Sequence, residues 1–286
     1  MEVQSITGES APRQAVRGSM WFVGCGNMAG AMVEGWRLAG LDLSSSVAIR
    51  PSGAPVEGLR TVRSLFEAGP APEIVVLGFK PQMLDEVAPD LRRFVDGAVV
   101  VSILAGVELA SLKARFPGAK AIVRAMPNLP VAVRRGVVGL VSDGLEQELR
   151  DRFGNLFRQL GTAIWSPDEA SFGALGSVAG AGPAYVARFI EALAGAGETR
   201  GLDPALALTI ARETVFGTAW LAAATNDSMD ALVARVRSPK GTTEAGLTVL
   251  EAELPNLVER TLTAAGQRSR ELADAARQID SPATLH

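Results

Sequence analysis

The sequence predicts an α/β protein with an N-terminal, Rossmann-type doubly wound parallel sheet and a C-terminal all-helical dimerisation domain. A glycine-rich turn separates a short apolar run from a helix-like run, and apolar runs then alternate with amphipathic segments to about residue 165. Beyond residue 167 the strand-like runs stop. Such alternation is typical of parallel sheets with crossover helices. We therefore expect a disordered tail at 1–18, a dinucleotide-binding domain at 19–166, and an all-helical substrate and dimerisation domain at 167–286.

The glycine turn has the pattern Gly24-x-Gly26-x-x-Ala29 and directly follows the apolar residues 20–23. Gly24 permits a tight turn, and Gly26 has no Cβ, so the backbone can approach a pyrophosphate. The first N–H groups of the following helix then face the anion at the positive end of the helix dipole. A strand–helix turn that binds nothing is the alternative, but the position between a strand and a helix favours a dinucleotide site.

The other elements of the first domain follow from apolar runs and their boundaries. We expect strands at 46–50, 73–79, 98–104, 119–125, 136–141 and 162–165, with helices at 84–94, 107–115 and 145–159. The strand at 73–79 ends in Lys80-Pro81. Because Pro cannot donate to a sheet ladder, the strand stops there, at the edge where open parallel sheets bind ligands.

The end of the second predicted strand indicates which dinucleotide is preferred. A site for NAD usually has Asp or Glu at this position, which binds the ribose 2′-hydroxyl. This chain has Arg50, Pro51 and Ser52 instead. A guanidinium and a hydroxyl suit a 2′-phosphate, which a carboxylate would repel. The sequence therefore favours NADP(H); a solvated arginine without a ligand is the alternative.

The second half of the chain is expected to be helical throughout. We expect helices at 183–196, 204–224, 228–236, 242–252 and 255–278. Small residues such as Ala192, Ala194, Gly195 and Ala196 permit close approach of helices. A largely apolar helical half with few aromatic residues also favours a dimer interface, as a hypothesis.

Composition and charge exclude several classes of function. The net charge of -3 gives no general reason to expect nucleic acid or an anionic membrane as a partner. No apolar stretch approaches the roughly 18 residues of a membrane span. The first 18 residues lack the apolar core of a signal peptide, so we expect a cytoplasmic protein. With one cysteine, Cys25, and one histidine, the terminal His286, we expect no metal site and no histidine-based triad.

Residues 236–246 predict a second ligand site. Ser238-Pro239 indicates a turn, Gly241 frees the backbone, and Thr242 or Thr243 can cap the next helix. Exposed N–H groups at the start of a helix bind a small carboxylate, and the Thr243 hydroxyl could contact the reacting end of a substrate. An ordinary capped helix is the alternative.

Six short motifs together resemble the pyrroline-5-carboxylate reductase family over residues 20–272. Pyrroline-5-carboxylate reductases catalyse the last step of proline biosynthesis. In chain order the motifs are the glycine turn with Asn27-Met28, Phe79-Lys80-Pro81, Ala105-Gly106, Arg124-Ala-Met-Pro-Asn128, Gly182-Pro-Ala-Tyr185 and Ser238-Pro-x-Gly-Thr-Thr243. The Ser-Pro loop weighs most, because other dinucleotide folds lack it.

The resemblance implies particular site residues and partners. It implies NADPH, with NADH as the alternative, bound by Gly24, Gly26, Asn27, Met28, Arg50, Ser52, Lys80, Pro81, Ala105 and Asn128. The substrate carboxylate would bind the loop of Ser238, on N–H groups of Gly241, Thr242 and Thr243. The Thr243 hydroxyl would be the catalytic group, hydrogen-bonded to the ring nitrogen. The family also implies a homodimer through the helical domain, or a larger homo-oligomer such as a decamer.

The implied reaction is the reduction of 1-pyrroline-5-carboxylate to L-proline by NAD(P)H, with hydride addition to C5 of the cyclic iminium. No strong protein base is needed, because the electrophile arrives already protonated. The protein mainly supplies orientation and a site for the carboxylate. This chemistry suits a chain whose one histidine is its last residue.

Four positions depart from the family's usual pattern. Lys240 stands where the Ser-Pro loop usually has its first Gly, Leu129 replaces Thr, Ala181 replaces Ser, and residues 133–136 lack a usual Gly near their start. These changes leave the reductase class in place but leave the exact cyclic imine open. Lys240 either attracts a carboxylate or points into solvent.

Three other functions compete with this interpretation. A hydroxyacid dehydrogenase would use a catalytic Lys on a helix of the second half, but Lys240 is the one Lys after residue 120 and lies in a loop. A reductase of a related cyclic imine keeps the whole site. A non-catalytic NADPH-binding regulator would keep the fold, and the intact Thr243 and glycine turn argue against it.

Overall fold

The computed structural model describes residues 18–225 and 227–280. The predicted tail, apart from Gly18, and His286 lie outside the described residues. The strands are β1 (Met20–Val23), β2 (Val47–Ile49), β3 (Arg60–Val62), β4 (Ile74–Leu77), β5 (Val99–Ser102), β6 (Ala121–Pro127), β7 (Gly136–Val141) and β8 (Gly161–Trp165). The α-helices are α1 (Asn27–Leu38), α2 (Leu84–Val95), α3 (Leu109–Arg115), α4 (Gln147–Arg158), α5 (Glu169–Ala179), α6 (Gly182–Glu198), α7 (Pro204–Ala224), α8 (Met229–Val236) and α9 (Thr242–Asp280). Short 3-10 helices are η1 (Leu65–Glu67), η2 (Pro81–Met83) and η3 (Leu129–Val133).

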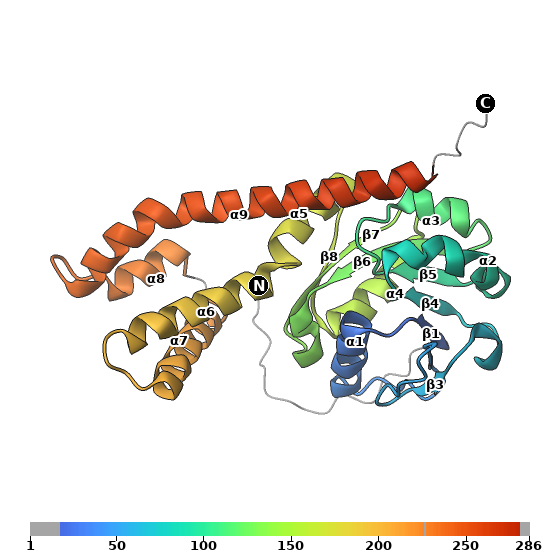
Figure 1. Ribbon diagram of the computed structural model, residues 1–286, viewed down its shortest axis with the longest axis horizontal. Coiled ribbons are helices and arrows are strands. Elements are labelled where there is room, and N and C mark those ends of the chain that lie inside the picture. Colours follow the sequence, from blue (N-terminus) through green and yellow to red (C-terminus); the bar gives the residue numbers. More distant parts are fainter. Residues whose placement is uncertain (1–17, 226, 281–286) are drawn as a thin grey trace. The chain divides into compact units, whose positions relative to one another are not determined.

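The strands form one eight-stranded sheet in the order β3-β2-β1-β4-β5-β6-β7-β8 (Figure 1). The first six strands follow the Rossmann order, with its switch point between β1 and β4. The Rossmann-type sheet followed by a helical domain is therefore confirmed. One pairing differs from a wholly parallel sheet, because β7 runs antiparallel to β6. The connection between these strands, around η3, is too short for a crossover helix, so the chain reverses instead.

Side chains on successive strand positions enter two different apolar layers. In β1, Met20 and Phe22 pack with α1 and α4, whereas Trp21 and Val23 pack with α2 and α3. Figure 1 shows α1 and α4 on one face of the sheet and α2 and α3 on the other. All four β1 side chains are buried. A strand covered on both faces must be apolar throughout, which explains the continuous apolar run before the glycine turn.

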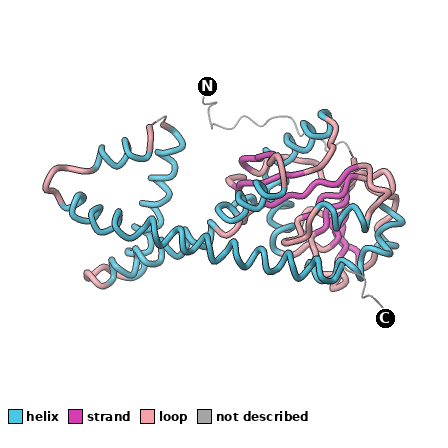
Figure 2. Tube along the Cα trace, turned by 90° about the horizontal axis from the view of Figure 1, so that it is seen from above, coloured by secondary structure: helices cyan, strands magenta, loops and turns pink. Residues whose placement is uncertain are grey.

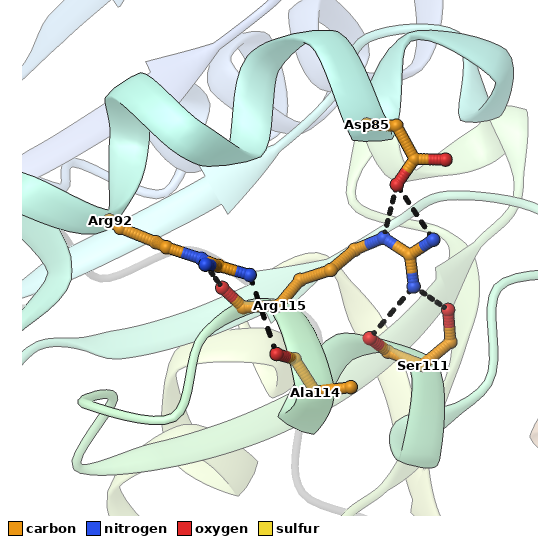
Figure 3. Close-up of polar contacts among 5 residues, drawn as sticks. All are labelled: Asp85, Arg92, Ser111, Ala114 and Arg115. Carbon is orange, nitrogen blue, oxygen red and sulfur yellow. Dashed lines mark hydrogen bonds and ion pairs between the residues drawn. The ribbon is translucent and has the colours of Figure 1, made fainter. Parts of the chain in front are cut away.

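Polar contacts fix α2 against α3 at the surface (Figure 3). The Arg115 guanidinium contacts the Asp85 carboxylate at 2.7 Å and also donates to the Ser111 hydroxyl at 2.7 Å. Arg92 Nε donates to the carbonyl of Arg115 at 2.5 Å, and its Nη2 lies 3.5 Å from the carbonyl of Ala114. These contacts satisfy carbonyl groups at the end of α3 that have no partner within the helix.

Three elements differ from the sequence prediction. β3 was not expected, because Arg60–Val62 is short and carries no apolar run. No helix was assigned specifically to the residues of α5. A break before Pro255 was expected, but α9 continues through it as one helix. Pro255 removes one backbone hydrogen bond, but the helix assignment continues without a break on both sides of it.

Backbone contacts divide the chain into two compact units. The helical unit is Gly182–Ala264, and the sheet unit holds the other described residues. The strands belong to the sheet unit alone (Figure 2). α5 belongs to the sheet unit too, since Phe172 is buried in its core and a Cβ built at Gly139 would lie 2.8 Å from Leu175 Cδ2.

The helical unit has a small apolar core of its own. Its fully buried apolar side chains are Ala194, Ala207 and Ala211, with Ile190 packed against them. Many larger apolar side chains of the unit are exposed. They include Val186, Phe189, Leu206, Leu208, Ile210, Phe216, Met229, Val236, Val249, Leu257 and Val258. Among the described residues, no helix has both the length and the apolar character required to cross a membrane.

Candidate active site

The glycine turn joins β1 to α1 with two glycines in different environments. Gly24 has φ +75°, and a Cβ built on it would lie 2.7 Å from the Phe79 nitrogen, so no other residue fits. A Cβ on Gly26 would meet nothing within 4 Å. Gly26 is also the N-cap of α1, and no side chain caps the first N–H groups of this helix. Gly24 is thus fixed by the fold, whereas Gly26 leaves open space beside uncapped N–H groups, as an anion site requires.

A cavity of about 960 Å³ opens beside this turn. Its lining includes Gly26 and Asn27 from the turn, Arg50 from the end of β2, and Pro55 and Val56 from the following loop. Pro55 and Val56 were not predicted from the sequence as site residues. Their position in the loop directly after Arg50 was the available signal, since that loop must border whatever binds at the end of β2.

Arg50 and Ser52 shape the turn at the end of β2. Arg50 is half-buried, and its Nη1 donates to the carbonyl of Ala54 at 3.0 Å. The Ser52 hydroxyl accepts from the Ala54 nitrogen at 3.2 Å. Within the described part of the chain, no carboxylate pairs with Arg50, and Glu57 in the same loop pairs with Arg37 at 2.7 Å. The positive charge at the end of β2 is therefore not neutralised by the protein.

Cys25 is buried inside the glycine turn. Burial raises the pKa of its thiol to about 11, and the nearby charge of Arg50 opposes this rise only in part. The thiol is therefore protonated at neutral pH. A protonated, buried thiol is a poor nucleophile, which agrees with the interpretation of Cys25 as a packed turn residue.

The remaining predicted cofactor residues follow three neighbouring strands. Lys80 and Pro81 follow β4, Ala105 follows β5, and Asn128 follows β6. Because these strands are parallel and in register, their carboxyl ends meet at one edge of the sheet. Lys80 and Ala105 are exposed there, while Asn128 is buried.

Asn128 has a structural role that does not follow from the sequence. Its Oδ1 accepts from the Val137 nitrogen at 2.8 Å, and its Nδ2 donates to the carbonyl of Ala179 at 3.0 Å. The side chain thus joins the end of β6 to β7 and to the end of α5. A buried amide with both ends bonded is held in one orientation.

The Ser-Pro loop lies in the helical unit and opens α9. Gly241 N donates to the carbonyl of Ser238 at 2.9 Å, and a Cβ on Gly241 would lie 2.2 Å from Ser238 Oγ. Lys240 has φ 58°, in the left-handed region that favours glycine. Its nitrogen donates to Glu244 Oε2 at 2.7 Å, which resembles the reciprocal bond of a capping box. The departure at Lys240 therefore falls on the one loop position with a left-handed backbone.

A smaller cavity of about 340 Å³ opens at the same helix start. Its lining includes Arg237, Lys240, Gly241 and Glu244, and Arg237 forms an ion pair with Glu251, another lining residue. The Thr243 hydroxyl has no hydrogen-bond partner among the residues that the structure describes. By contrast, the Thr248 and Thr261 hydroxyls of α9 donate to carbonyls one turn back, at 3.0 Å and 2.8 Å. Thr243 thus keeps its hydroxyl available.

Many of the predicted residues gather in two places, whereas Lys80, Pro81, Ala105 and Asn128 line neither cavity. Gly26, Asn27 and Arg50 line the cavity of the sheet unit, with Gly24, Met28 and Ser52 adjacent in the chain. Gly241 lines the cavity of the helical unit, with Ser238, Thr242 and Thr243 adjacent. In residues 18–225 and 227–280, no group of three or more His, Cys, Asp or Glu side chains is placed to hold a metal ion.

Two family models match the chain in the same two regions. Residues 19–106 match the model described as NADP oxidoreductase coenzyme F420-dependent. Residues 169–272 match the model described as pyrroline-5-carboxylate reductase dimerisation.

Whole-chain relatives are also found. The chain is 36% identical over 265 residues to the pyrroline-5-carboxylate reductase of Pseudomonas aeruginosa, covering 88% of this chain and 96% of that protein. A solved pyrroline-5-carboxylate reductase from Coxiella burnetii is 31% identical, with a TM-score of 0.81 over 89% of this chain and 98% of that one. The Plasmodium falciparum pyrroline carboxylate reductase, solved with NADP bound, has a TM-score of 0.82 at 24% identity, over 91% of this chain and 100% of that one.

Proposed function

The chain belongs to the pyrroline-5-carboxylate reductase family, and on that premise we propose which residues perform its reaction. It is an NADP-dependent oxidoreductase that reduces 1-pyrroline-5-carboxylate to L-proline. The family, reaction and cofactor predicted from the sequence are thereby confirmed. Family membership also decides against a hydroxyacid dehydrogenase.

We propose that the turn and strand ends of the sheet unit hold NADPH. The observation that carries this assignment is the open space at Gly26, beside the uncapped start of α1 and the cavity that Arg50 lines. The pyrophosphate would bind N–H groups of Asn27 and Met28, and Arg50 and Ser52 would bind the adenosine ribose phosphate. Lys80, Pro81, Ala105 and Asn128, at the ends of β4 to β6, would border the nicotinamide and its ribose. When bound, NADPH supplies the hydride for reduction of the imine.

We propose that the Ser-Pro loop binds the substrate carboxylate through the N–H groups of Thr242 and Thr243, and through that of Gly241 where the carboxylate takes over its bond from the Ser238 carbonyl. Gly241 is held close to Ser238, which gives the loop a fixed shape before substrate arrives. The Thr243 hydroxyl, which is not engaged elsewhere in the described chain, would hydrogen-bond the ring nitrogen and orient C5. The substrate enters as the protonated imine, an iminium ion, so the loop positions the electrophile and needs no strong base.

The role of Thr243 is tested by NADPH oxidation with pyrroline-5-carboxylate, comparing Thr243→Ala with Thr261→Ala. Thr261 is the matched control, because its hydroxyl donates to a helix carbonyl of the same α9. We expect kcat/KM to fall by roughly 10- to 1,000-fold for Thr243→Ala, as for loss of one oriented hydrogen bond. Wild-type turnover with an unchanged Thr243→Ala would remove the role of Thr243. NADPH binding without turnover would favour a different cyclic imine or a regulator.

The protein forms a homo-oligomer through its dimerisation domain and acts on a small-molecule substrate. We propose a homodimer through the helical unit, with dimers assembling into a larger ring such as a decamer. The exposed apolar side chains of that unit support the dimer, because a unit with three buried alanines as its core needs a partner surface. Sedimentation velocity at micromolar concentration tests this. A monomer would refute the dimer, and a dimer alone would refute the decamer.

We also propose a domain division and a cellular location for the chain. The first assigns residues 19–166 to the dinucleotide-binding domain and 167–286 to the substrate and dimerisation domain. The second places the protein in the cytoplasm. Limited proteolysis tests the first by the fragment that still binds NADPH, and fractionation of the source cells tests the second.

A further inference from the structure

Two arginines lie at equivalent positions on the adjacent strands β2 and β3. Ile49 pairs with Val62 in the parallel ladder, and Arg50 and Arg63 are the next residues of the two strands. The Arg50 nitrogen donates to the Val62 carbonyl at 2.8 Å, so the pairing continues to this point. The carboxyl ends of parallel strands meet at one edge, so the two cationic residues are neighbours there.

The Arg63 guanidinium lies against the turn that contains Ser52. Gly53 has φ +69°, and its nitrogen donates to the Arg50 carbonyl at 2.8 Å, which closes a tight turn over residues 50–53. A Cβ built on Gly53 would lie 2.8 Å from Nε and 3.1 Å from Nη2 of Arg63. The Arg63 guanidinium thus lies beside Gly53, the residue that follows Ser52.

The charged groups around Arg63 bind other partners, and none of them pairs with its guanidinium in the described chain. In the described chain, neither a carboxylate nor a carbonyl accepts a hydrogen bond from its guanidinium. Arg37 pairs with Glu57 at 2.7 Å, and Arg60 Nη1 donates to the carbonyl of Glu67 at 3.1 Å. The Glu67 carboxylate accepts from the Ser64 hydroxyl at 2.7 Å. The turn of residues 50–53 therefore carries two guanidiniums without a paired acid.

We propose that Arg63 is a second guanidinium for the ribose 2′-phosphate of NADPH and sets the preference for NADPH over NADH. This inference rests on the proposed placement of that phosphate at Arg50 and Ser52. A phosphate dianion accepts several charge-assisted hydrogen bonds, and guanidiniums from two strands can bind different oxygens of it. NADH lacks this phosphate, so Arg63 adds nothing to its binding.

The test compares the dissociation constants of NADPH and NADH, measured by nicotinamide fluorescence, for wild type and Arg63→Gln. We expect binding of NADPH to weaken roughly tenfold, as for one lost charge-assisted contact, and binding of NADH to change less than twofold. Arg93→Gln is the control for net charge, because Arg93 is an exposed α2 residue of the same unit. Arg63→Lys keeps the charge but loses the planar guanidinium with its several N–H donors, so it should keep only part of the NADPH affinity.

The outcomes separate this inference from the cofactor placement beneath it. If Arg50→Gln loses the preference for NADPH over NADH while Arg63→Gln keeps it, the role of Arg63 alone is overturned. Unchanged discrimination in both variants would overturn the placement of the 2′-phosphate, and with it the role of Arg63. Equal weakening of NADPH and NADH in Arg63→Gln, with the same melting temperature as wild type, would also overturn the inference.

Discussion

The Arg124 guanidinium of β6 and the Glu169 carboxylate of α5 form an ion pair that joins the sheet to the helix beyond its last strand. The Arg124 side chain is 10% exposed, and its Cζ lies 4.7 Å from the centre of the Phe172 ring. The other oxygen of Glu169 accepts from the Leu109 nitrogen at 2.8 Å. Burial lowers the pKa of Arg124, and Glu169 opposes that shift. One carboxylate therefore connects β6, α3 and α5.

Removing the charge of Glu169 should destabilise the sheet unit. Glu169→Gln keeps an oxygen for Leu109 but removes the main counter-ion of the buried Arg124 cation, and the nearby charge of Glu108 compensates only in part. We expect a loss of about 3 kcal/mol in the free energy of unfolding, measured in urea. Arg188→Gln is the control, because its pair with Glu191 has side chains 80% and 66% exposed and should contribute less than about 0.5 kcal/mol. Equal effects of the two variants would contradict this prediction.

Asn128→Ala should cost stability independently of any effect on catalysis. It leaves the Val137 nitrogen and the Ala179 carbonyl without their side-chain partner. Each unsatisfied buried group costs about 1–3 kcal/mol, so we expect a loss of about 2–4 kcal/mol in unfolding free energy. Asn128→Asp keeps an acceptor but loses the donor, and should fall between wild type and Asn128→Ala. A variant as stable as wild type would show that water replaces the amide.

Cys25 should be unreactive and should make stability depend on alkaline pH. A raised pKa means that the folded state holds the thiol proton more tightly than the unfolded chain does. The resulting stability is present below about pH 9 and is lost as pH rises toward 11, at most about 3 kcal/mol. Because Cys25 is the one cysteine, alkylation by iodoacetamide reports on it alone. Rapid alkylation of the native protein at pH 8, or the same alkaline loss in Cys25→Ala, would contradict this prediction.

Lys240 combines a backbone effect and a charge effect that two substitutions separate. Lys240→Gly relieves the left-handed backbone, while Lys240→Gln removes the charge and keeps the strain. We expect both to raise KM for pyrroline-5-carboxylate about two- to fivefold, as loss of an exposed charge next to a carboxylate would. Lys240→Gly should alter stability by less than about 1 kcal/mol, because relief of strain is offset by the entropy of the unfolded glycine. An unchanged KM would remove the attraction of Lys240 for the carboxylate.

Much of the fold follows from the sequence because its signals are local. The residues of β1 and β4 are apolar on both faces, and α7 begins at Pro204 as its sequence predicts. The signal fails where tertiary pairing decides the structure. Arg60–Val62 becomes β3 because it pairs with β2, and Gly136–Val141 runs antiparallel because its connection is short. Neither pairing leaves a periodic pattern in its own residues.

The candidate site could be predicted to a different degree in each part. Gly24 and Gly26 were identified from spacing, since their backbone requirements are specific. The hydrogen bonds of the Asn128 side-chain amide could not be predicted, because its partner Ala179 is 51 residues further along the chain. Arg63 was missed for the same reason, since its neighbour Gly53 is reached only through the pairing of β2 with β3.

The small core of the helical unit makes its stability a matter of mass action. The sheet unit buries large side chains such as Trp21, Trp36 and Phe153 within one chain, so it can fold at any dilution. The helical unit leaves Phe189, Phe216 and other apolar side chains exposed. A second copy of the chain must therefore cover these side chains before the helical unit reaches its full stability. Dilution should lower the melting temperature of the helices while leaving that of the sheet in place, and cells that make little of this protein would hold a larger fraction of it in an inactive, half-folded form.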